Sequence, residues 1–354
     1  MVRIEGIRVS WERRALAQIL DRTAETEPRI ATRWPLYADP ASGSWTTTAR
    51  GSWAGGFWAG LLWLRVVVHG DEGAHAAASR RTAALAPWVE ADTAARGLIF
   101  WYGTALARDC PESDALRKRA AQACLDAFDP ELGMVPWGTA FNGPRELARV
   151  DALPGLVPLL GLAGPAGDAA AGAQLRLQID LTDDAAVPAW ARRPDGTWRA
   201  HPEPPPGWSR TIGWLALACA DAAHTGRVLP PGDLRRILAR PCVAARFAPG
   251  SPAVPPASAV RQGSPPDTSA AAIEAVAALK LAALAEGRAA SALRDRAAGV
   301  LAELVGSHLR DGRLLDGCYD LVHGVATRHE LVWGDFFLAA GLAMLIGAIG
   351  PFAC

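Results

Sequence analysis

One acidic residue, Asp151, opens an otherwise apolar segment. The segment runs from residue 151 to residue 157 and continues with Ala, Leu, Pro, Gly, Leu and Val. A single carboxyl group in such surroundings can give and take a proton as a general acid and base. Asp151 could instead cap a helix, since an Asp followed closely by Pro154 is typical of a helix start. The residues alone leave both interpretations open and favour the cap.

Tryptophan is unusually frequent, with 14 Trp against 8 Phe and 3 Tyr. An indole face stacks on a sugar ring while its N–H finds a polar partner, so Trp residues can form a saccharide site. They can equally fill the core of a large protein. Four lie beside Gly or polar residues and away from continuous apolar runs, and we expect at least one of them to line a pocket: Trp53, Trp137, Trp208 and Trp333.

Helices and the loops between them must position these side chains. Apolar residues recur at helical spacing, and sustained alternation of the strand type is nearly absent. Asp71, which follows a Gly, is a candidate helix N-cap. The segments expected to be helical are 11–27, 54–68, 71–88, 95–108, 114–128, 151–163, 210–225, 232–240, 268–286, 289–307 and 330–349.

Helices that alternate with Gly- and Pro-rich loops predict helical hairpins arranged in sequence. The repeating unit pairs an inner helix rich in small residues with a more charged outer helix. Small residues let neighbouring inner helices approach closely, and a concave site then forms where loops and inner-helix N-termini meet. No shift in composition marks a second domain, so we expect one catalytic domain over residues 1–354.

Composition excludes several classes of function. The 36 basic and 36 acidic residues give a formal net charge of zero, without the basic stripe of a nucleic-acid-binding protein. The six cysteines show no CxxC and no zinc spacing, which is typical of free thiols in a reducing cytoplasm. The N-terminal stretch has no signal-peptide pattern. The uncharged run 336–353 contains three Gly and a Pro, which favours a buried helix over a membrane span.

Six segments, taken in chain order, resemble the motifs of one enzyme family. They are WAGGFWAGLLWL at 53–64 with HGDE at 69–72, VDALPGL at 150–156, WSRTIGW at 208–214, DTSAA at 267–271, GCY at 317–319 and ELVWGDFFL at 330–338. Together they resemble glycoside hydrolase family 88, the unsaturated glucuronyl hydrolases, and more distantly family 105. The resemblance covers the chain from about residue 45 onward and implies an all-α fold, an (α/α)6 barrel of helical hairpins.

The resemblance also implies a reaction. The family hydrates the C4=C5 bond of an unsaturated uronic acid at the end of an oligosaccharide. Protonation at C4 leaves an oxocarbenium-like C5, water adds there, and the hemiketal collapses to release the neighbouring sugar. One well-placed carboxyl group suffices, so Asp151 is implied as general acid and base, and neither a metal nor another cofactor is required.

Several further residues match family positions at the substrate. Arg210 would bind the uronate carboxylate with its planar guanidinium, whereas a paired helix Arg is the alternative. His201 would border the site or lie solvated in its loop. The remaining candidates are the stacking residues Trp53, Trp137 and Trp208, and Trp333, Asp267 and Ser269, for which core packing or helix capping is the alternative.

Several departures from the family pattern weaken the prediction of the family's standard activity but not the prediction of the barrel fold. Ala95 stands where the family has a second aspartate, and Asp92 lies one helical turn earlier. Ala152 replaces an Asn and Ile212 replaces a Gln. Each lost hydrogen bond to a buried partner costs about 1–3 kcal/mol, so recognition of the ordinary substrate should be weaker.

Three functions are consistent with these residues. The first is a cytoplasmic hydrolase acting on an unsaturated uronide. The second is an enzyme on the same barrel that acts on a modified sugar or a specialised metabolite. The third is a non-catalytic saccharide-binding protein. For each of them we expect a small saccharide or sugar-containing ligand and no nucleic-acid or membrane partner. The sequence does not determine the oligomeric state.

Overall fold

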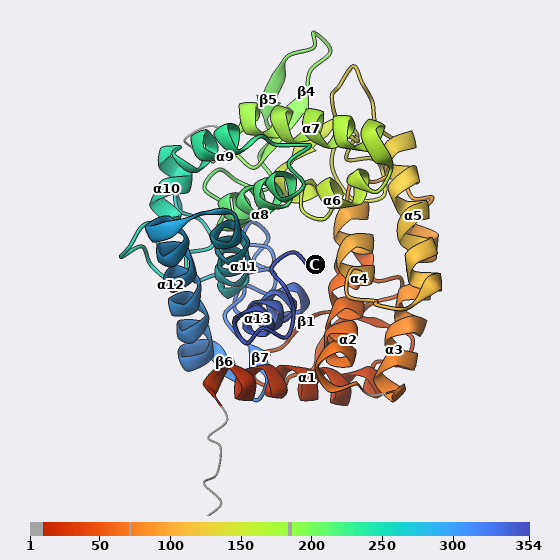
Figure 1. Ribbon diagram of the computed structural model, residues 1–354, viewed down its shortest axis with the longest axis vertical. Coiled ribbons are helices and arrows are strands. Elements are labelled where there is room, and N and C mark those ends of the chain that lie inside the picture. Colours follow the sequence, from red (N-terminus) through yellow and green to blue (C-terminus); the bar gives the residue numbers. More distant parts are fainter. Residues whose placement is uncertain (1–9, 71, 183–185) are drawn as a thin grey trace, which may run out of the picture.

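The computed structural model describes residues 10–70, 72–182 and 186–354, so Asp71, the candidate N-cap, lies outside the described residues. Two concentric rings of helices form the protein (Figure 1). The inner ring comprises α2 (Gly55–His69), α4 (Tyr102–Thr104), α6 (Leu156–Gly161), α8 (Arg210–His224), α11 (Thr268–Leu284) and α13 (Val332–Leu345). The outer ring comprises α1 (Trp11–Arg29), α3 (Glu72–Ala83), α5 (Pro111–Asp126), α7 (Gly164–Leu181), α9 (Pro231–Leu238), α10 (Pro241–Phe247) and α12 (Gly287–Glu303). This arrangement confirms the predicted all-α (α/α)6 barrel.

The inner helices pack closely because small residues lie where they meet. A Cβ added at Gly56 of α2 would lie 2.3 Å from the Leu98 carbonyl oxygen. One added at Gly97 would lie 2.1 Å from the Leu156 backbone nitrogen. Neither space admits a side chain, so these glycines set the distance between neighbouring inner elements. The expected role of small residues in the inner ring is thereby confirmed.

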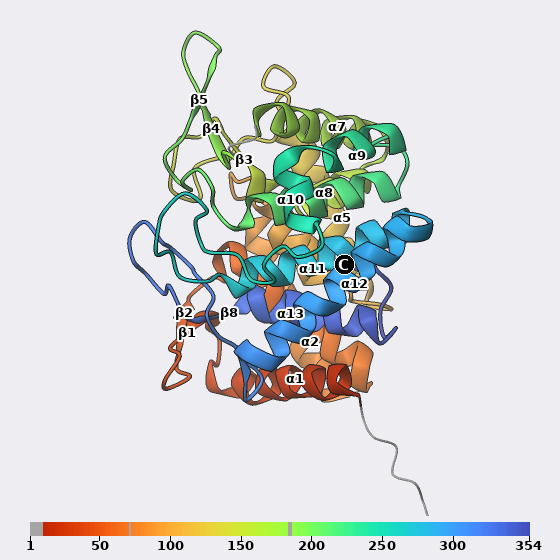
Figure 2. The ribbon, with the colours of Figure 1, turned by 90° about the vertical axis from the view of Figure 1, so that its left-hand side faces the viewer.

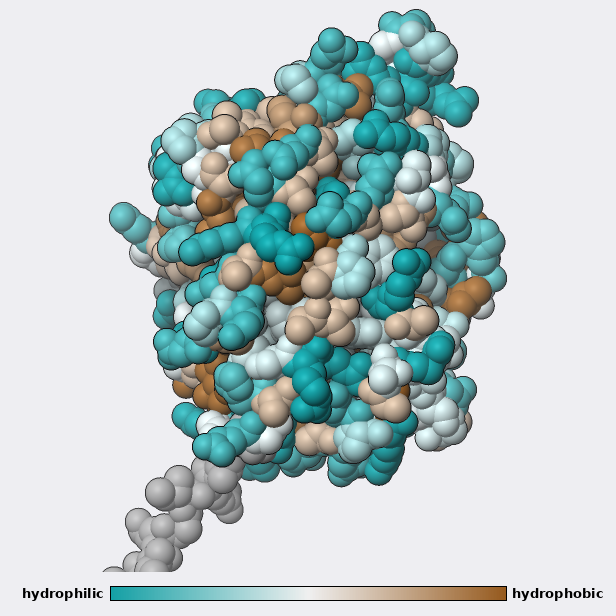
Figure 3. Space-filling view, turned by 90° about the vertical axis from the view of Figure 1, so that its right-hand side faces the viewer, coloured by the Kyte–Doolittle hydropathy of each residue, from teal (hydrophilic) through white to brown (hydrophobic). Residues whose placement is uncertain are grey.

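The outer helices bury one face and expose the other. In α1, Leu16, Ile19 and Leu20 are buried while charged residues face solvent. On the molecular face drawn in Figure 3, hydrophilic residues predominate and hydrophobic ones form small separate patches. A continuous hydrophobic core cluster contains residues from both rings, from Ala15 to Cys354. Burial of that core is the main force that holds the two rings together.

Three small antiparallel sheets supplement the helices. One has the strand order β2 (Trp45–Thr48), β1 (Trp34–Ala38), β8 (Glu330–Leu331), and a second has the order β3 (Leu147–Arg149), β4 (Ala189–Arg192), β5 (Trp198–Ala200). The third pairs β6 (Leu309–Arg310) with β7 (Arg313–Leu314). Figure 2 shows β1–β5 and β8 together with long loops at one end of the barrel. Strands of two to five residues are too short to show alternation, so almost no strand pattern is visible in the sequence.

The structure corrects several predicted helices. The segment 95–108 forms a π-helical turn from Gly97 to Trp101 that continues into the short α4. In the segment 151–163, a 3-10 turn (Val150–Ala152) precedes α6. Helices α7 and α10 were missed, because the Gly content of the first and the Pro-rich surroundings of the second resemble loops. The run 336–353 belongs to the buried α13 and the turns after it, and no described helix is long and apolar enough to traverse a bilayer.

Candidate active site

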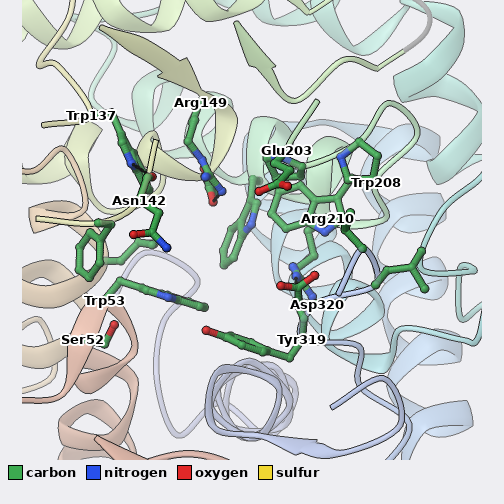
Figure 4. Close-up of a pocket in the computed structure, with 18 residues that line it drawn as sticks. Ser52, Trp53, Trp137, Asn142, Arg149, Glu203, Trp208, Arg210, Tyr319 and Asp320 are labelled. Carbon is green, nitrogen blue, oxygen red and sulfur yellow. Dashed lines mark hydrogen bonds and ion pairs between the residues drawn. The ribbon is translucent and has the colours of Figure 1, made fainter. Parts of the chain in front are cut away.

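A cavity of about 310 Å³ lies at the end of the barrel where the loops gather. Most of its lining comes from loop segments, and inner elements contribute the rest. Figure 4 shows Trp137 and Arg149 on one side, Trp208 and Arg210 on the other, and Trp53 with Tyr319 below them. The lining residues are 52, 53, 98, 137, 141, 142, 149, 151, 203–205, 208, 210, 214 and 319–322.

Asp151 lies in this lining, with its side chain 15% exposed. The 3-10 turn that carries it caps no helix: α6 begins at Leu156 with Gly155 at its N-cap. The helix-cap interpretation of Asp151 is therefore wrong. Instead, both carboxylate oxygens accept hydrogen bonds from Arg149, at 2.9 Å from Nε and 2.7 Å from Nη2. Asp151 is thus an oriented carboxylate that reaches the cavity.

Arg149 also joins Asp151 to a tryptophan. The guanidinium carbon lies 4.3 Å from the centroid of the Trp137 ring, a cation–π geometry. The indole Nε1 of Trp137 in turn donates to the Asn142 carbonyl oxygen at 2.9 Å. Trp137, Arg149 and Asp151 therefore form one packed group, which we call the Asp151 unit.

A second group of the same composition forms the opposite wall. The Arg210 guanidinium lies 4.5 Å from the Trp208 ring centroid, and its Nη1 donates to Asp267 at 2.8 Å. We call Trp208, Arg210 and Asp267 the Asp267 unit. Nη1 and Nη2 of Arg210 also donate to the carbonyl oxygens of Cys318 and Tyr319, at 2.6 and 3.2 Å. Among the described residues its Nε has no partner, so that N–H remains for a ligand.

Asp267 lies behind this wall and has no exposed surface. It is the N-cap of α11, where its carboxylate accepts from the Ser269 backbone N–H at 3.2 Å, which confirms the capping alternative. It also accepts from the hydroxyls of Ser209 and Ser269, each at 2.6 Å, and from the Cys318 N–H at 3.2 Å. Asp267 and Ser269 were predicted to bind substrate, but the structure places them beneath Arg210 and outside the cavity lining.

Aromatic rings form the floor between the two units. Trp53 and Tyr319 line the cavity, and each ring packs on Trp333, with centroids 4.8 and 5.9 Å apart. Trp333 itself is fully buried, so this candidate supports the floor without reaching the cavity. Burial and the negative charge of Asp320 raise the pKa of Tyr319, which keeps its phenol protonated and able to donate a hydrogen bond.

The rim carries two further carboxylates. Glu203 and Asp320 line the cavity, and His323 lies between them, with Nδ1 2.8 Å from Asp320 and Nε2 4.0 Å from Glu203. The hydrogen bond to Asp320, reinforced by its charge, raises the pKa of His323. The predicted His201 is outside the lining; its Nδ1 lies 2.7 Å from the Glu203 carbonyl oxygen, so it braces the loop that carries Glu203.

Trp214 is a lining residue with an unused donor. Its side chain is 1% exposed, and its indole N–H has no partner among the described residues. A buried N–H without a partner is costly. Trp214 is the last residue of the WSRTIGW segment at 208–214, and its place in that motif was the signal that could have identified it.

The position at which the resemblance predicts a second aspartate contributes no carboxylate to the cavity. Ala95 is fully buried, and Leu98, three residues later, lines the wall instead. Asp92 is directed elsewhere: it accepts from the backbone N–H of Thr139 at 3.1 Å and pairs with Arg145 at 3.5 Å. The cavity therefore has Asp151 as the only carboxylate on its inner walls among the described residues, and the other two lie at the rim.

Five of the lining residues were predicted from the sequence, and the others were not. Arg149 was missed although it lies two residues before Asp151, a spacing that places side chains on one side of an extended chain. Tyr319 had a signal in the GCY segment, where it is one of only three tyrosines. Glu203 and Asp320 had none, since charged loop residues are usually solvated. The five found are Trp53, Trp137, Asp151, Trp208 and Arg210.

No protein-family model and no curated protein sequence matches the chain. Several solved structures, however, are similar to this chain. An unsaturated glucuronyl hydrolase from Bacillus sp. GL1 superposes with a TM-score of 0.82 at 20% identity, covering 95% of this chain and 97% of that one. A heparin-specific unsaturated glucuronyl hydrolase gives 0.81 at 17% identity, covering 96% and 98%. The enzyme from Streptococcus agalactiae gives 0.81 at 15% identity, covering 97% of each chain. The fold of this chain is therefore that of the unsaturated glucuronyl hydrolases over nearly its whole length.

Proposed function

We propose that this chain is a single-domain hydrolase that hydrates the C4=C5 bond of an unsaturated uronic acid sugar, with Asp151 as its general acid and base. The observation that carries this proposal is the position of Asp151, an oriented carboxylate beside a tryptophan-walled cavity. The fold supports it, since similar structures belong to unsaturated glucuronyl hydrolases. Two of these were studied with dGlcA-Glc-Rha-Glc and dGlcA-GalNAc6S, which are unsaturated oligosaccharides.

The proposed chemistry balances with one carboxyl group. Asp151 delivers a proton to C4, the C4=C5 bond is consumed, and positive charge develops on C5 and the ring oxygen. The resulting carboxylate takes a proton from a water molecule, whose oxygen bonds to C5. Asp151 is thereby restored, and the hemiketal opens and releases the neighbouring sugar. General acid–base catalysis of this kind contributes about 10²- to 10⁴-fold to a rate.

Other lining residues would bind and orient the substrate. The Nε of Arg210 and the N–H of Trp214 are unused donors that could hold the uronate carboxylate. Trp53 offers an indole face for a sugar ring, and the Tyr319 phenol offers one further donor. Arg149 would keep the Asp151 carboxylate in one orientation, because a bidentate pair fixes both oxygens.

The test uses the full chain and the unsaturated disaccharide dGlcA-GalNAc6S. We expect the ultraviolet absorbance of the conjugated double bond to fall while mass spectrometry detects the released amino sugar. Asp151→Asn should slow this reaction at least about 100-fold. The matched control is Asp126→Asn, which changes an outer-helix carboxylate that lies outside the cavity lining. Equal rates for wild type and Asp151→Asn, or no consumption of the double bond of this disaccharide or of the non-sulfated ones compared below, would refute the proposal.

A second candidate is the same reaction on a modified sugar. The rim carboxylates Glu203 and Asp320 favour it, because they would repel a sulfated or carboxylated neighbouring sugar and attract one that carries an amino group. The family aspartate replaced by Ala95 also points away from the ordinary substrate. Comparing initial rates on unsaturated disaccharides with a sulfated, an acetylated or a free amino sugar decides between the two. Fastest turnover of the sulfated compound would eliminate the second candidate.

A further inference from the structure

A second cavity, of about 440 Å³, lies between helix α1 and strand β2 and shares no lining residue with the first. Its volume falls within the range of about 300–1,000 Å³ typical of small-molecule sites. We call it the α1–β2 cavity. The residues that bear on its chemistry are Arg22, Thr26, Arg29, Arg33, Trp45 and Thr47.

Three arginines face this cavity, and its lining contains no carboxylate among the described residues. Arg22 pairs with the buried Glu330 at 3.2 Å, and that carboxylate also pairs with Arg313 at 2.9 Å. Arg29 has only a loose, exposed pair with Glu25 at 3.8 Å. Arg33 donates to the hydroxyl and the carbonyl oxygen of Thr47, at 2.6 and 2.8 Å, and has no carboxylate partner among the described residues. The cavity therefore carries net positive charge.

Two buried polar groups in the same lining lack partners. Thr26 is 1% exposed, yet its hydroxyl makes no hydrogen bond with any described residue. The indole N–H of Trp45 is likewise buried without a partner. Buried polar groups are usually hydrogen-bonded, and these two belong to the lining of the same cavity. Both groups can donate, and the cations beside them favour an anion.

We propose that the α1–β2 cavity binds a sugar that carries a tetrahedral oxyanion ester, either a sulfate or a phosphate. The oxyanion would accept from the guanidinium of Arg33, the hydroxyl of Thr26 and the indole of Trp45. The cavity is larger than a lone inorganic ion, so the proposed occupant carries the ester on a sugar ring. Because it shares no lining residue with the first cavity, this site is an ancillary one, separate from the proposed chemistry.

The experiment is calorimetry on the full chain with glucose 6-sulfate, glucose 6-phosphate, inorganic sulfate and glucose. We expect one of the two esters to bind more tightly than inorganic sulfate, and glucose to give no heat. Affinity should fall as salt rises, because the contact is between charges. Whichever ester binds more tightly identifies the source of the oxyanion. Absence of binding by both esters, or inorganic sulfate binding as tightly as both, would refute the proposal.

Two variants remove different contacts. Arg33→Gln should weaken ester binding about tenfold, the loss expected for a hydrogen bond to a charged group. Thr26→Val keeps the shape and removes only the unused hydroxyl, so we expect weaker binding with no loss of thermal stability. The matched control is Arg288→Gln, which removes an exposed arginine on α12 and leaves affinity unchanged. Equal affinities for wild type, Arg33→Gln and Thr26→Val would place the ester elsewhere and overturn the assignment.

Discussion

The two walls of the first cavity contain the same three residue types in different states. In the Asp151 unit the Asp and Arg side chains are 15% and 17% exposed and lie two residues apart in the chain. In the Asp267 unit they are 0% and 6% exposed and lie 57 residues apart. Asp267 accepts from Ser209, Arg210, Ser269 and Cys318, whereas Asp151 accepts only from Arg149 among the described residues.

The difference separates a structural carboxylate from a reactive one. Asp267 accepts hydrogen bonds from four residues in three segments of the chain. It therefore stabilises the wall and has no oxygen available for a substrate. Asp151 lines the cavity and accepts only from Arg149 among the described residues, so each of its oxygens can accept a further hydrogen bond. Polar groups that are fully satisfied make a site rigid, and a group left partly satisfied beside a cavity can engage a ligand. Residue type and pairing alone would not distinguish these two aspartates.

The largest expected effect concerns stability. Asp267→Asn leaves the buried Arg210 without its counter-charge and should lower the free energy of unfolding by about 3 kcal/mol. Asp151→Asn should lower it by less, since that pair joins residues two apart in the chain and both side chains retain some contact with solvent. Urea denaturation followed by circular dichroism measures both. Equal losses in the two variants would mean that the walls do not differ as described.

The next effect concerns the orientation of Asp151. Arg149→Lys retains the positive charge but loses the bidentate geometry, so we expect kcat on the unsaturated disaccharide to fall about tenfold. The melting temperature should change little, because both side chains are partly exposed. The matched variant is Arg210→Lys, which should lower the melting temperature as well. Unchanged kcat in Arg149→Lys would show that Asp151 needs no orienting partner.

A smaller effect, on KM, concerns which of the two cavity walls the substrate carboxylate contacts. Trp214→Phe removes one unused N–H and keeps the ring, so stability should hold or rise slightly. If the substrate accepts from this N–H, KM should rise about fivefold while kcat holds. Trp137→Phe serves for comparison, since the N–H of Trp137 already donates to Asn142. An unchanged KM in Trp214→Phe would place the substrate carboxylate nearer to the Asp151 unit.

The smallest effect concerns the rim that extends the Asp267 unit. The pair with Asp320 raises the pKa of His323 above its ordinary value of 6.5, so NMR titration should give a midpoint above 6.5 that falls in Asp320→Asn. The folded state binds this proton more tightly than the unfolded state. The stabilising contribution of the pair is therefore complete below pH 6.5 and is lost as pH rises through the raised pKa. A midpoint unchanged by Asp320→Asn would exclude the pair.

The barrel was predictable because its inner helices, such as α2 and α13, are apolar nearly all round and are separated by Gly and Pro. Five lining residues were predictable because they belong to motifs or resemble carbohydrate-binding tryptophans. The roles of Asp267 and Trp333 were not, since burial depends on which distant segments meet. The pairing of Arg149 with Asp151 depends on a three-residue strand that adjoins a 3-10 turn, and so short a strand has no periodic signal.

The pairing of β1 with β8 aligns Tyr37 with Leu331 and joins the earliest described hairpin to the last inner helix. Tyr37 also packs on Tyr319, in the floor of the first cavity, with ring centroids 5.4 Å apart. The ring of helices closes at this seam, and the cavity floor is complete only when it has closed. Contacts between such distant segments form late and slowly in folding. Ligand binding therefore requires that the first and last parts of the helical ring have come together. A chain in which β1 and β8 are not paired would have helices but no complete site.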